Sequence, residues 1–415
     1  MNLQRKAIDR FTNTIIFMEV LSKSKQLWRK LLGGLMRSLC LQFEEECYPV
    51  RIGIRCIDEI VSNLLELNAS SFHLITDKLL SKLHAAELYD QLSVHALVNM
   101  SVIDSRELLK SLRTVECLAE KMVCAGIDRA SVVVAVGGGV VGNIAGLLAA
   151  LLFRGIRLVH VPTTLIAAAD SVASLKQAVN LSSGKNLLGC FHKPTAVLID
   201  LNFLQTLPAA QIRSGMYEII KNALTVATEN IPFLESGLRL DANYSDTELM
   251  VIVEAGLLAK QKVMKVDKCE RKEALVFEYG HTVGHAIELV AEGRVPHGEA
   301  VGLGMIVAAE VSSRLGLLSD ADKSLHHRLL KLNGLAVKLP VGVTVAAVMA
   351  LLSTDNKRGY LFTRPDQVAM ILLDCLGIPA GPIDRPLVLV DASLIQSCIE
   401  DCLVEVNDVS TGAKP

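Results

Sequence analysis

The chain has 415 residues, of which 51% are hydrophobic and 21% are charged, so it can bury a large core and is not a disordered protein. Its formal net charge is -2, which gives no general attraction to nucleic acid or to an anionic membrane. We therefore expect neither partner, and an anionic substrate must be held by a local cluster of cations.

The first forty residues differ in charge from the rest of the chain. They contain eight Lys and Arg residues but only Asp9 and Glu19 as acids. A basic amphipathic helix, a targeting peptide, an appended start and a disordered segment all fit this composition. We therefore treat residues 1–40 as an N-terminal extension, and residues 406–415 as a tail.

The next segment, 41–207, alternates short β-branched runs with helical stretches. The pattern predicts strands over 71–76, 131–136, 156–161 and 195–199, and helices over 105–125 and 142–153. The apolar run from Val140 to Phe153 is too short to span a bilayer, so it indicates a buried helix. Strands separated by helices predict an α/β nucleotide-binding domain with a mostly parallel sheet.

After Leu207-Pro208 the pattern becomes helical. Helical spacing occurs over 211–225, 247–266, 280–290, 298–315 and 323–332, and strand signals are nearly absent before 368–373. The sequence thus predicts a second, mostly α-helical domain over 208–405 that holds metal and substrate. A cleft between two domains is a common ligand site.

The glycine loop Gly137–Gly142 satisfies GxGxxG and lies between a predicted strand and a predicted helix. Such glycines let the backbone approach a pyrophosphate whose charge the helix N-terminus stabilises. A tight turn without a ligand is the plainer alternative. The acid that a standard Rossmann dehydrogenase places about 20 residues later is absent, because no acid occurs before Asp170. Dinucleotide binding is favoured, and an ordinary dehydrogenase is not.

Three histidines occur within seventeen residues, at His281, His285 and His297, and Glu299 follows them. Two histidines and a carboxylate with open positions form a common catalytic metal site. Spacing alone favours His281 and His285, which lie four residues apart on one helical face, as the metal pair. Buried histidines that bond within a core are the alternative. The HExxH protease signature is absent, because Thr282 follows His281.

Polar residues are dense between the glycine loop and residue 222. Lysines offer point charges for a phosphate, and an arginine offers a bidentate fork. Each residue alone is more often a solvated surface group, but together with the glycine loop and the histidines they indicate a phosphorylated, hydroxylated substrate. The group comprises Arg154, Thr163, Thr164, Asp170, Lys176, Asn180, Lys185, Asn186, Glu218, Lys221 and Asn222.

Ten cysteines are scattered along the chain without a CxxC pair. Nothing indicates a disulfide framework in a protein of this size, so we expect reduced thiols and a cytoplasmic location.

Several motifs in order along the chain resemble the 3-dehydroquinate synthase superfamily of sugar-phosphate cyclases. The resemblance runs from about residue 41 to beyond residue 357, nearly the whole chain apart from the extension. The motifs are Gly137-Gly138-Gly139-Val140-Val141-Gly142-Asn143, Arg154-Gly155-Ile156-Arg157, Val161-Pro162-Thr163-Thr164, Gly184-Lys185-Asn186, Gly280-His281-Thr282 and His297-Gly298-Glu299.

The resemblance implies one NAD, one divalent metal ion (Co²⁺ or Zn²⁺) and a homodimer. By matched position it puts Glu218, His281 and His297 on the metal and His285 near the phosphate, which overrules the choice of His285 from spacing. It implies NAD contacts from Glu107, Lys110, Gly138, Gly139, Asn143, Thr163, Thr164, Asp170, Lys185, Phe203 and Thr206. It implies substrate or phosphate contacts from Arg154, Lys176, Asn186, Lys221, Lys260, His285 and Lys357, with Arg154 reaching into a neighbouring subunit. The family usually has Asp where this chain has Asn143, which puts that contact in doubt.

Two positions in the sequence indicate which branch of the superfamily, and therefore which substrate, this chain resembles. Dehydroquinate synthases have an arginine seven residues before the metal histidine and an asparagine three before it, and this chain has Ala274 and Glu278 there. Since that arginine serves a substrate carboxylate, its loss indicates a substrate without one. A glutamate at 278 resembles the branch that cyclises glucose 6-phosphate in aminoglycoside biosynthesis, and sedoheptulose 7-phosphate cyclases typically depart from the GHTxGH pattern retained here.

The implied reaction is transient oxidation at C4 by NAD, elimination of phosphate, re-reduction, and an intramolecular aldol closure. We expect Lys176, Lys221, Glu278 and His285 to act in it, with Glu278 as the proton relay and the lysines steadying oxyanions. The alternatives are another cyclase of the superfamily, a metal-dependent polyol dehydrogenase, and a catalytically retired ligand-binding or partner subunit.

Overall fold

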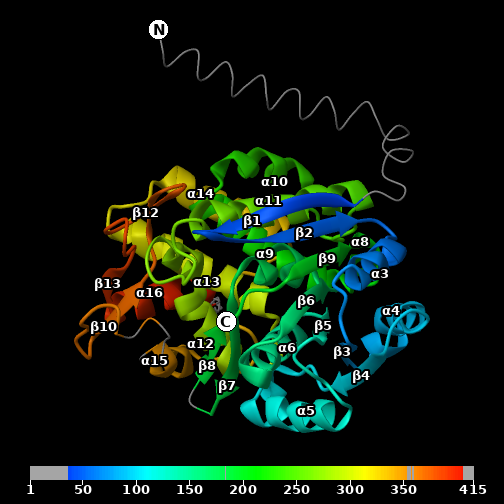
Figure 1. Cartoon of the computed structure of the whole chain (residues 1–415). Coiled ribbons are helices and arrows are strands. Elements are labelled where there is room, and N and C mark those ends of the chain that lie inside the picture. The colour runs from blue at the N-terminus through cyan, green and yellow to red at the C-terminus, as the bar shows by residue number, and fades with distance from the viewer. Residues whose placement is uncertain (1–35, 183, 353–356, 358, 405–415) are drawn as a thin grey trace, which may run out of the picture.

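The computed structural model describes residues 36–404 except 183, 353–356 and 358, and it has two parts (Figure 1). Most of the predicted extension and the whole predicted tail lie outside the described residues. The extension's last residues, however, belong to a strand, β1, which begins at Arg37. Leu39, Leu41 and Phe43 alternate with polar residues there, which is the period-two pattern of a strand.

The first part is built on a seven-stranded sheet in the order β1-β2-β9-β6-β5-β3-β4. Only the β1–β2 pair is antiparallel, so the mostly parallel α/β sheet is confirmed. The strands are β1 Arg37–Phe43, β2 Glu46–Gly53, β3 Phe72–Asp77, β4 Val98–Ile103, β5 Val132–Gly137, β6 Arg157–Pro162 and β9 Ala196–Asp200.

Helices cover both faces of this sheet. Along β5, Val133 and Ala135 pack into one core cluster with α5 and α6, while Val132 and Val134 pack into another with α3 and α4. This alternation explains the continuous valine run, because a strand covered on both faces is apolar at every position. The helices are α3 Ile57–Leu65, α4 His84–Ser93, α5 Leu112–Cys124, α6 Gly139–Leu151, α7 Leu165–Ala169 and α8 Leu201–Leu204.

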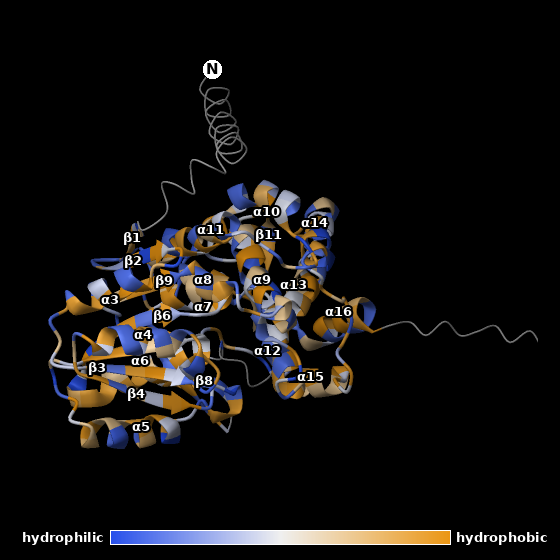
Figure 2. Ribbon diagram, turned by 90° about the vertical axis from the view of Figure 1, so that its right-hand side faces the viewer, coloured by the Kyte–Doolittle hydropathy of each residue, from blue (hydrophilic) through white to orange (hydrophobic). Residues whose placement is uncertain are grey.

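The second part is mostly helical, as predicted, and lies beside the sheet (Figure 2). Its helices are α9 Ala209–Thr225, α10 Ile231–Gly237, α11 Asp246–Met264, α12 His281–Val290, α13 His297–Arg314, α14 Asp320–Leu332, α15 Val345–Leu352 and α16 Ala392–Leu403. Two small antiparallel pairs join β10 Gln367–Met370 to β13 Val388–Asp391, and β11 Leu373–Cys375 to β12 Ile378–Pro379.

Several local predictions need correction. The helix predicted over 105–125 is a 3₁₀ turn, Glu107–Leu109, followed by α5, because the Ser111 side chain accepts from the Thr114 amide and starts a new helix. The strand predicted over 368–373 divides between β10 and β11. The hairpin of β7 Lys176–Leu181 and β8 Gly184–Phe191 was not predicted, and neither were β1, β2 and β4.

No helix among the described residues is both long and apolar enough to cross a membrane. All ten cysteines are free thiols in the structure.

The close approach of α12 and α13 depends on glycine. A Cβ atom at Gly304 would lie 1.9 Å from the carbonyl oxygen of Gly280, at the start of α12. We expect Gly304→Ala to destabilise the fold by about 1–3 kcal/mol, because overpacking forces these helices apart. Denaturant midpoints followed by circular dichroism would measure the change. Gly302→Ala is the matched control, since its Cβ would meet only side chains at 3.3 Å. Equal midpoints for the two variants would contradict this prediction.

Candidate active site

The glycine loop joins β5 to α6 at the carboxyl edge of the sheet, where nucleotides bind in parallel α/β folds. Gly138 is the N-cap of α6, and a Cβ there would lie 3.1 Å from Thr164. The loop borders an open pocket whose lining includes Gly137, Gly138, Gly139, Asn143 and Lys176. A loop of glycines, which have no side chains, at a helix N-terminus beside a pocket is suited to bind the phosphates of a dinucleotide.

Asn143 has both polar atoms of its side chain engaged. Its Nδ2 donates to the Gly139 carbonyl at 2.8 Å, and its Oδ1 accepts from the Ala178 amide at 3.0 Å. The residue thereby ties the first turn of α6 to β7. An aspartate could not make the first of these bonds, because a carboxylate only accepts.

The other predicted cofactor residues around the sheet's carboxyl edge gather in two groups. The Thr163 amide donates to the Gly137 carbonyl at 3.0 Å, and the Thr164 hydroxyl caps α7, so both threonines lie beside the glycine loop. Phe203 stacks on His84 with ring centroids 4.2 Å apart, and His84 Nε2 lies 3.0 Å from the Thr206 hydroxyl. Sequence reasoning did not select His84.

A third group forms where η2 (Glu107–Leu109) meets the β7–β8 hairpin. Lys185 Nζ lies 3.6 Å from Glu107, and Lys110 donates to the Asn186 side chain. Burial lowers the pKa of Lys110 to about 8 although Glu107 opposes the shift. The structure thus brings Glu107, Lys110, Lys185 and Asn186 together.

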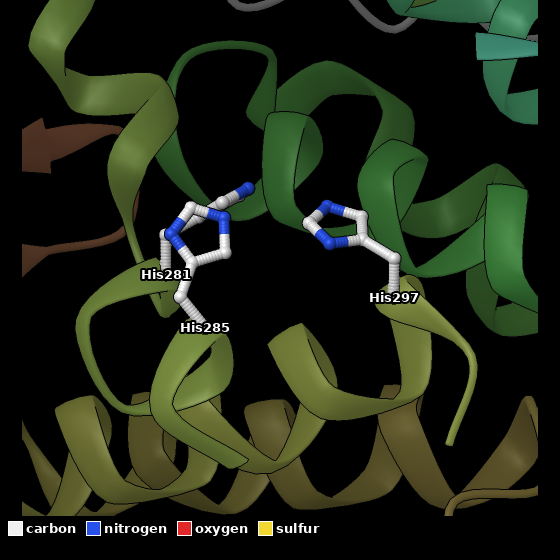
Figure 3. A group of neighbouring side chains, drawn as sticks. All are labelled: His281, His285 and His297. Carbon is white, nitrogen blue, oxygen red and sulfur yellow. The ribbon is translucent and has the colours of Figure 1, made fainter. Parts of the chain in front are cut away.

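The three histidines converge from two helices: His281 and His285 lie on α12 and His297 on α13 (Figure 3). One ligand atom from each lies within 4.8 Å of the others. His281 Nδ1 is 3.1 Å from the Tyr279 carbonyl, and His297 Nδ1 is 3.0 Å from Glu288 Oε2. Because both partners accept, each Nδ1 carries a hydrogen, and in the neutral imidazole each Nε2 keeps a lone pair for a metal ion.

Both of these Nε2 atoms face Glu218. Its Oε1 lies 3.7 Å from His281 Nε2 and 3.4 Å from His297 Nε2, and it has no hydrogen-bond partner among the described residues. Burial raises the pKa of Glu218, but nearby positive charge, above all the Lys221 ammonium, outweighs burial and holds that pKa well below its usual range. Two imidazole nitrogens and a carboxylate oxygen that converge in a buried site form a common donor set, so these residues fit a divalent metal ion.

His285 lies near the same point, with its ring centroid 4.9 Å from that of His281. Distance alone therefore fits three histidines as well as two histidines with Glu218. The hydrogen bonds described above favour His281 and His297, since both have Nδ1 fixed by an acceptor. The assignment of the metal to Glu218, His281 and His297 remains a proposal.

The predicted substrate lysines are paired with acids. Lys221 pairs with Glu218, Lys176 with Glu270 at 2.7 Å, Lys260 with Asp170 at 3.1 Å, and Lys357 with Glu278 at 3.9 Å. All these side chains except that of Lys176 are less than one-fifth exposed. The lysines thus come from β7, α9, α11 and the segment after α15, and such a cluster provides the local cations that a near-neutral chain needs for a phosphate.

Two acids at the site escaped sequence reasoning. Glu270 accepts from Lys176 and from the Ser174 hydroxyl, and no sequence pattern marked it. Glu288 accepts from His297 and from Lys185. A signal for Glu288 did exist, because residues 281, 285 and 288 share one face of a helix.

Arg154 is the one predicted site residue that lies apart. It is exposed and follows the end of α6, whereas the glycine loop forms the opposite end, at the start of that helix. Thirteen residues of helix span about 20 Å, so Arg154 is far from the glycine loop of its own chain.

Comparison with known proteins identifies the family. The family described as 3-dehydroquinate synthase N-terminal matches residues 100–214, and the one described as 3-dehydroquinate synthase C-terminal matches residues 215–358. A 2-deoxy-scyllo-inosose synthase from Micromonospora echinospora is 47% identical over 354 residues, which cover 85% of this chain and 89% of that protein.

Two solved structures are similar along most of the chain. A 2-deoxy-scyllo-inosose synthase complexed with carbaglucose-6-phosphate, NAD⁺ and Co²⁺ has a TM-score of 0.84 at 36% identity, covering 88% of this chain and 100% of that one. A 2-epi-5-epi-valiolone synthase from Streptomyces hygroscopicus with NAD⁺ and Zn²⁺ bound has a TM-score of 0.75 at 26% identity, covering 86% of this chain and 97% of that one.

Proposed function

Because the chain belongs to the 2-deoxy-scyllo-inosose synthases of the 3-dehydroquinate synthase family, we propose that it converts D-glucose 6-phosphate into 2-deoxy-L-scyllo-inosose and phosphate. The enzyme is a phosphate-eliminating lyase that uses NAD and a divalent metal, Co²⁺ or Zn²⁺. The observation that carries the proposal is the buried Glu218 oxygen faced by two imidazole nitrogens, beside a dinucleotide loop and a group of lysines.

Glu218, His281 and His297 would hold the metal, and the glycine loop with Thr163, Thr164 and the Glu107–Lys185 group would hold NAD. When bound, NAD supplies reversible hydride transfer at C4 and the metal supplies a Lewis acid for the adjoining oxygens. Transient oxidation makes the C5 proton acidic, which is why a redox cofactor serves a reaction without net oxidation.

The chain's own groups then bind and move protons. Lys176 and Lys221 would steady developing oxyanions, and His285 with Lys357 would orient the phosphate. Glu278 is the candidate proton relay during elimination. Burial raises the pKa of Glu278, but His281 and Lys357 outweigh burial and hold that pKa well below the ordinary glutamate range, so the side chain is ionised before the substrate binds.

The substrate branch is supported by the residues beside Glu278. Ala274, where dehydroquinate synthases have the arginine that serves a carboxylate, is only 1% exposed and provides no cation. A methyl side chain cannot pair with a substrate carboxylate as an arginine does, which disfavours dehydroquinate chemistry.

We also propose a homodimer in which Arg154 binds phosphate in the neighbouring active site. The support is the resemblance, together with the exposure of Arg154 and its distance from its own glycine loop. Complementation between Arg154→Ala and His281→Ala subunits would test this arrangement.

We expect the enzyme with catalytic NAD to release one phosphate per glucose 6-phosphate without accumulating NADH. Phosphate assay, absorbance of reduced nicotinamide and NMR of the product would follow the reaction, with sedoheptulose 7-phosphate as the competing substrate. Sustained NADH production would instead indicate a polyol dehydrogenase, and a valiolone-type product would place the chain in the other cyclase branch.

A further inference from the structure

Glu288 lies on the same face of α12 as His281 and His285 and is largely buried, with 12% of its side chain exposed. Its two oxygens contact different parts of the molecule. Oε2 is 3.0 Å from His297 Nδ1 on α13, and Oε1 accepts from Lys185 Nζ on β8 at 2.6 Å. Lys185 in turn lies 3.6 Å from Glu107. One carboxylate therefore joins a histidine of the helical part to a cationic group of the sheet part.

We infer that Glu288 is a positioning residue that fixes the His297 imidazole for the metal and couples metal binding to NAD binding through Lys185. The inference rests on the proposed function, in which His297 binds the metal and Lys185 contacts NAD. A carboxylate that accepts from the Nδ1–H of a ligating histidine fixes the tautomer, holds the ring plane and makes Nε2 more basic.

The coupling has a definite sign. While Lys185 holds Glu288, part of the carboxylate's charge is neutralised and less of it acts on His297. When NAD binds and draws Lys185 away from Glu288, the full negative charge of the carboxylate acts on His297. This strengthens the metal site. Since coupling free energy is reciprocal, metal should tighten NAD by the same factor that NAD tightens metal.

The first test measures Co²⁺ affinity of the purified full chain without NAD, by competition with a chelator. Glu288→Leu removes both contacts and should weaken Co²⁺ binding about 10–100-fold. Glu288→Gln keeps a neutral acceptor for Nδ1–H and should fall between Glu288→Leu and the unmodified chain. The control is Glu310→Gln on α13, a carboxylate of similar exposure (16%) that pairs with Arg314 and Lys323 rather than with a histidine.

A His297→Ala variant separates the inference from the proposed function. If His297→Ala loses Co²⁺ affinity and Glu288→Leu does not, the positioning role is wrong while the ligand set stands. If neither variant loses affinity, the ligand set itself is wrong. Circular dichroism and melting temperature establish folding, and the Co²⁺ absorption spectrum of Glu288→Gln should show altered ligand geometry that a purely structural defect would not produce.

The second test titrates NAD by calorimetry with and without saturating Co²⁺. The unmodified chain should bind NAD at least about 5-fold more tightly with metal, the lower end of typical coupling. In Glu288→Gln and in Lys185→Met this ratio should approach one, and the double variant should show no further loss. A ratio preserved in Glu288→Gln would overturn the coupling.

Discussion

Replacing His281 with alanine is expected to remove tight metal binding and to lower turnover by at least about a thousand-fold, because the lost Lewis acid is worth several kcal/mol. His281 is 8% exposed, and its Nδ1 is held by the Tyr279 carbonyl, so Nε2 has one direction in which to bind. The variant also removes one of the two imidazoles that face the buried Glu218 carboxylate, and it leaves His297 and Lys221 in place.

The measurement combines metal content by mass spectrometry after dialysis with the phosphate-release assay. His95→Ala is the control, because His95 is exposed and lies beyond the end of α4, in the sheet part. NAD binding without metal should persist, because the glycine loop belongs to the other part of the chain. Full metal retention in His281→Ala would mean that His281 is not a ligand.

Much of the fold could be predicted because burial on both faces leaves a strong local signal. The valine run of β5 and the apolar helix α6 are examples, since all six residues of β5 and seven of the thirteen in α6 are buried. The β7–β8 hairpin gave no such signal. Its alternation is interrupted by polar residues that contact acids or one another rather than a core: Lys176, Asn180, Lys185 and Asn186.

The types of residue in the candidate site could be predicted from the sequence, whereas the contacts between those residues were harder to predict. Helical spacing placed His281 and His285 together but could not show where Glu218 of α9 would lie. That contact depends on how α9 packs against α12 and α13. Glu270 was unpredictable for the same reason: it follows α11, and only the packed structure brings it to Lys176 and Ser174.

A Glu278→Gln variant should keep NAD and metal yet lower phosphate release by about 10²–10⁴-fold, the usual contribution of a positioned acid or base. Glu278 Oε2 is buried, lies 3.9 Å from Lys357 Nζ and has no hydrogen-bond partner among the described residues. Glutamine has the same shape but cannot take up a proton, so the pocket should survive while proton transfer fails. Calorimetry of NAD and Co²⁺ binding checks the first expectation, and the phosphate assay checks the second.

The control for this variant is Glu273→Gln, which changes a carboxylate at the start of the same 3₁₀ turn, η6 (Glu273–Glu278). If the Glu273→Gln enzyme keeps normal turnover and the Glu278→Gln enzyme does not, the loss of activity is not caused by a general loss of negative charge along η6. Glu278→Asp should recover part of the activity, because it restores a proton acceptor at a shorter reach. A fully active Glu278→Gln enzyme would remove Glu278 from the chemistry and leave proton transfer to the departing phosphate, whose oxygens are the other base brought into this pocket with the substrate.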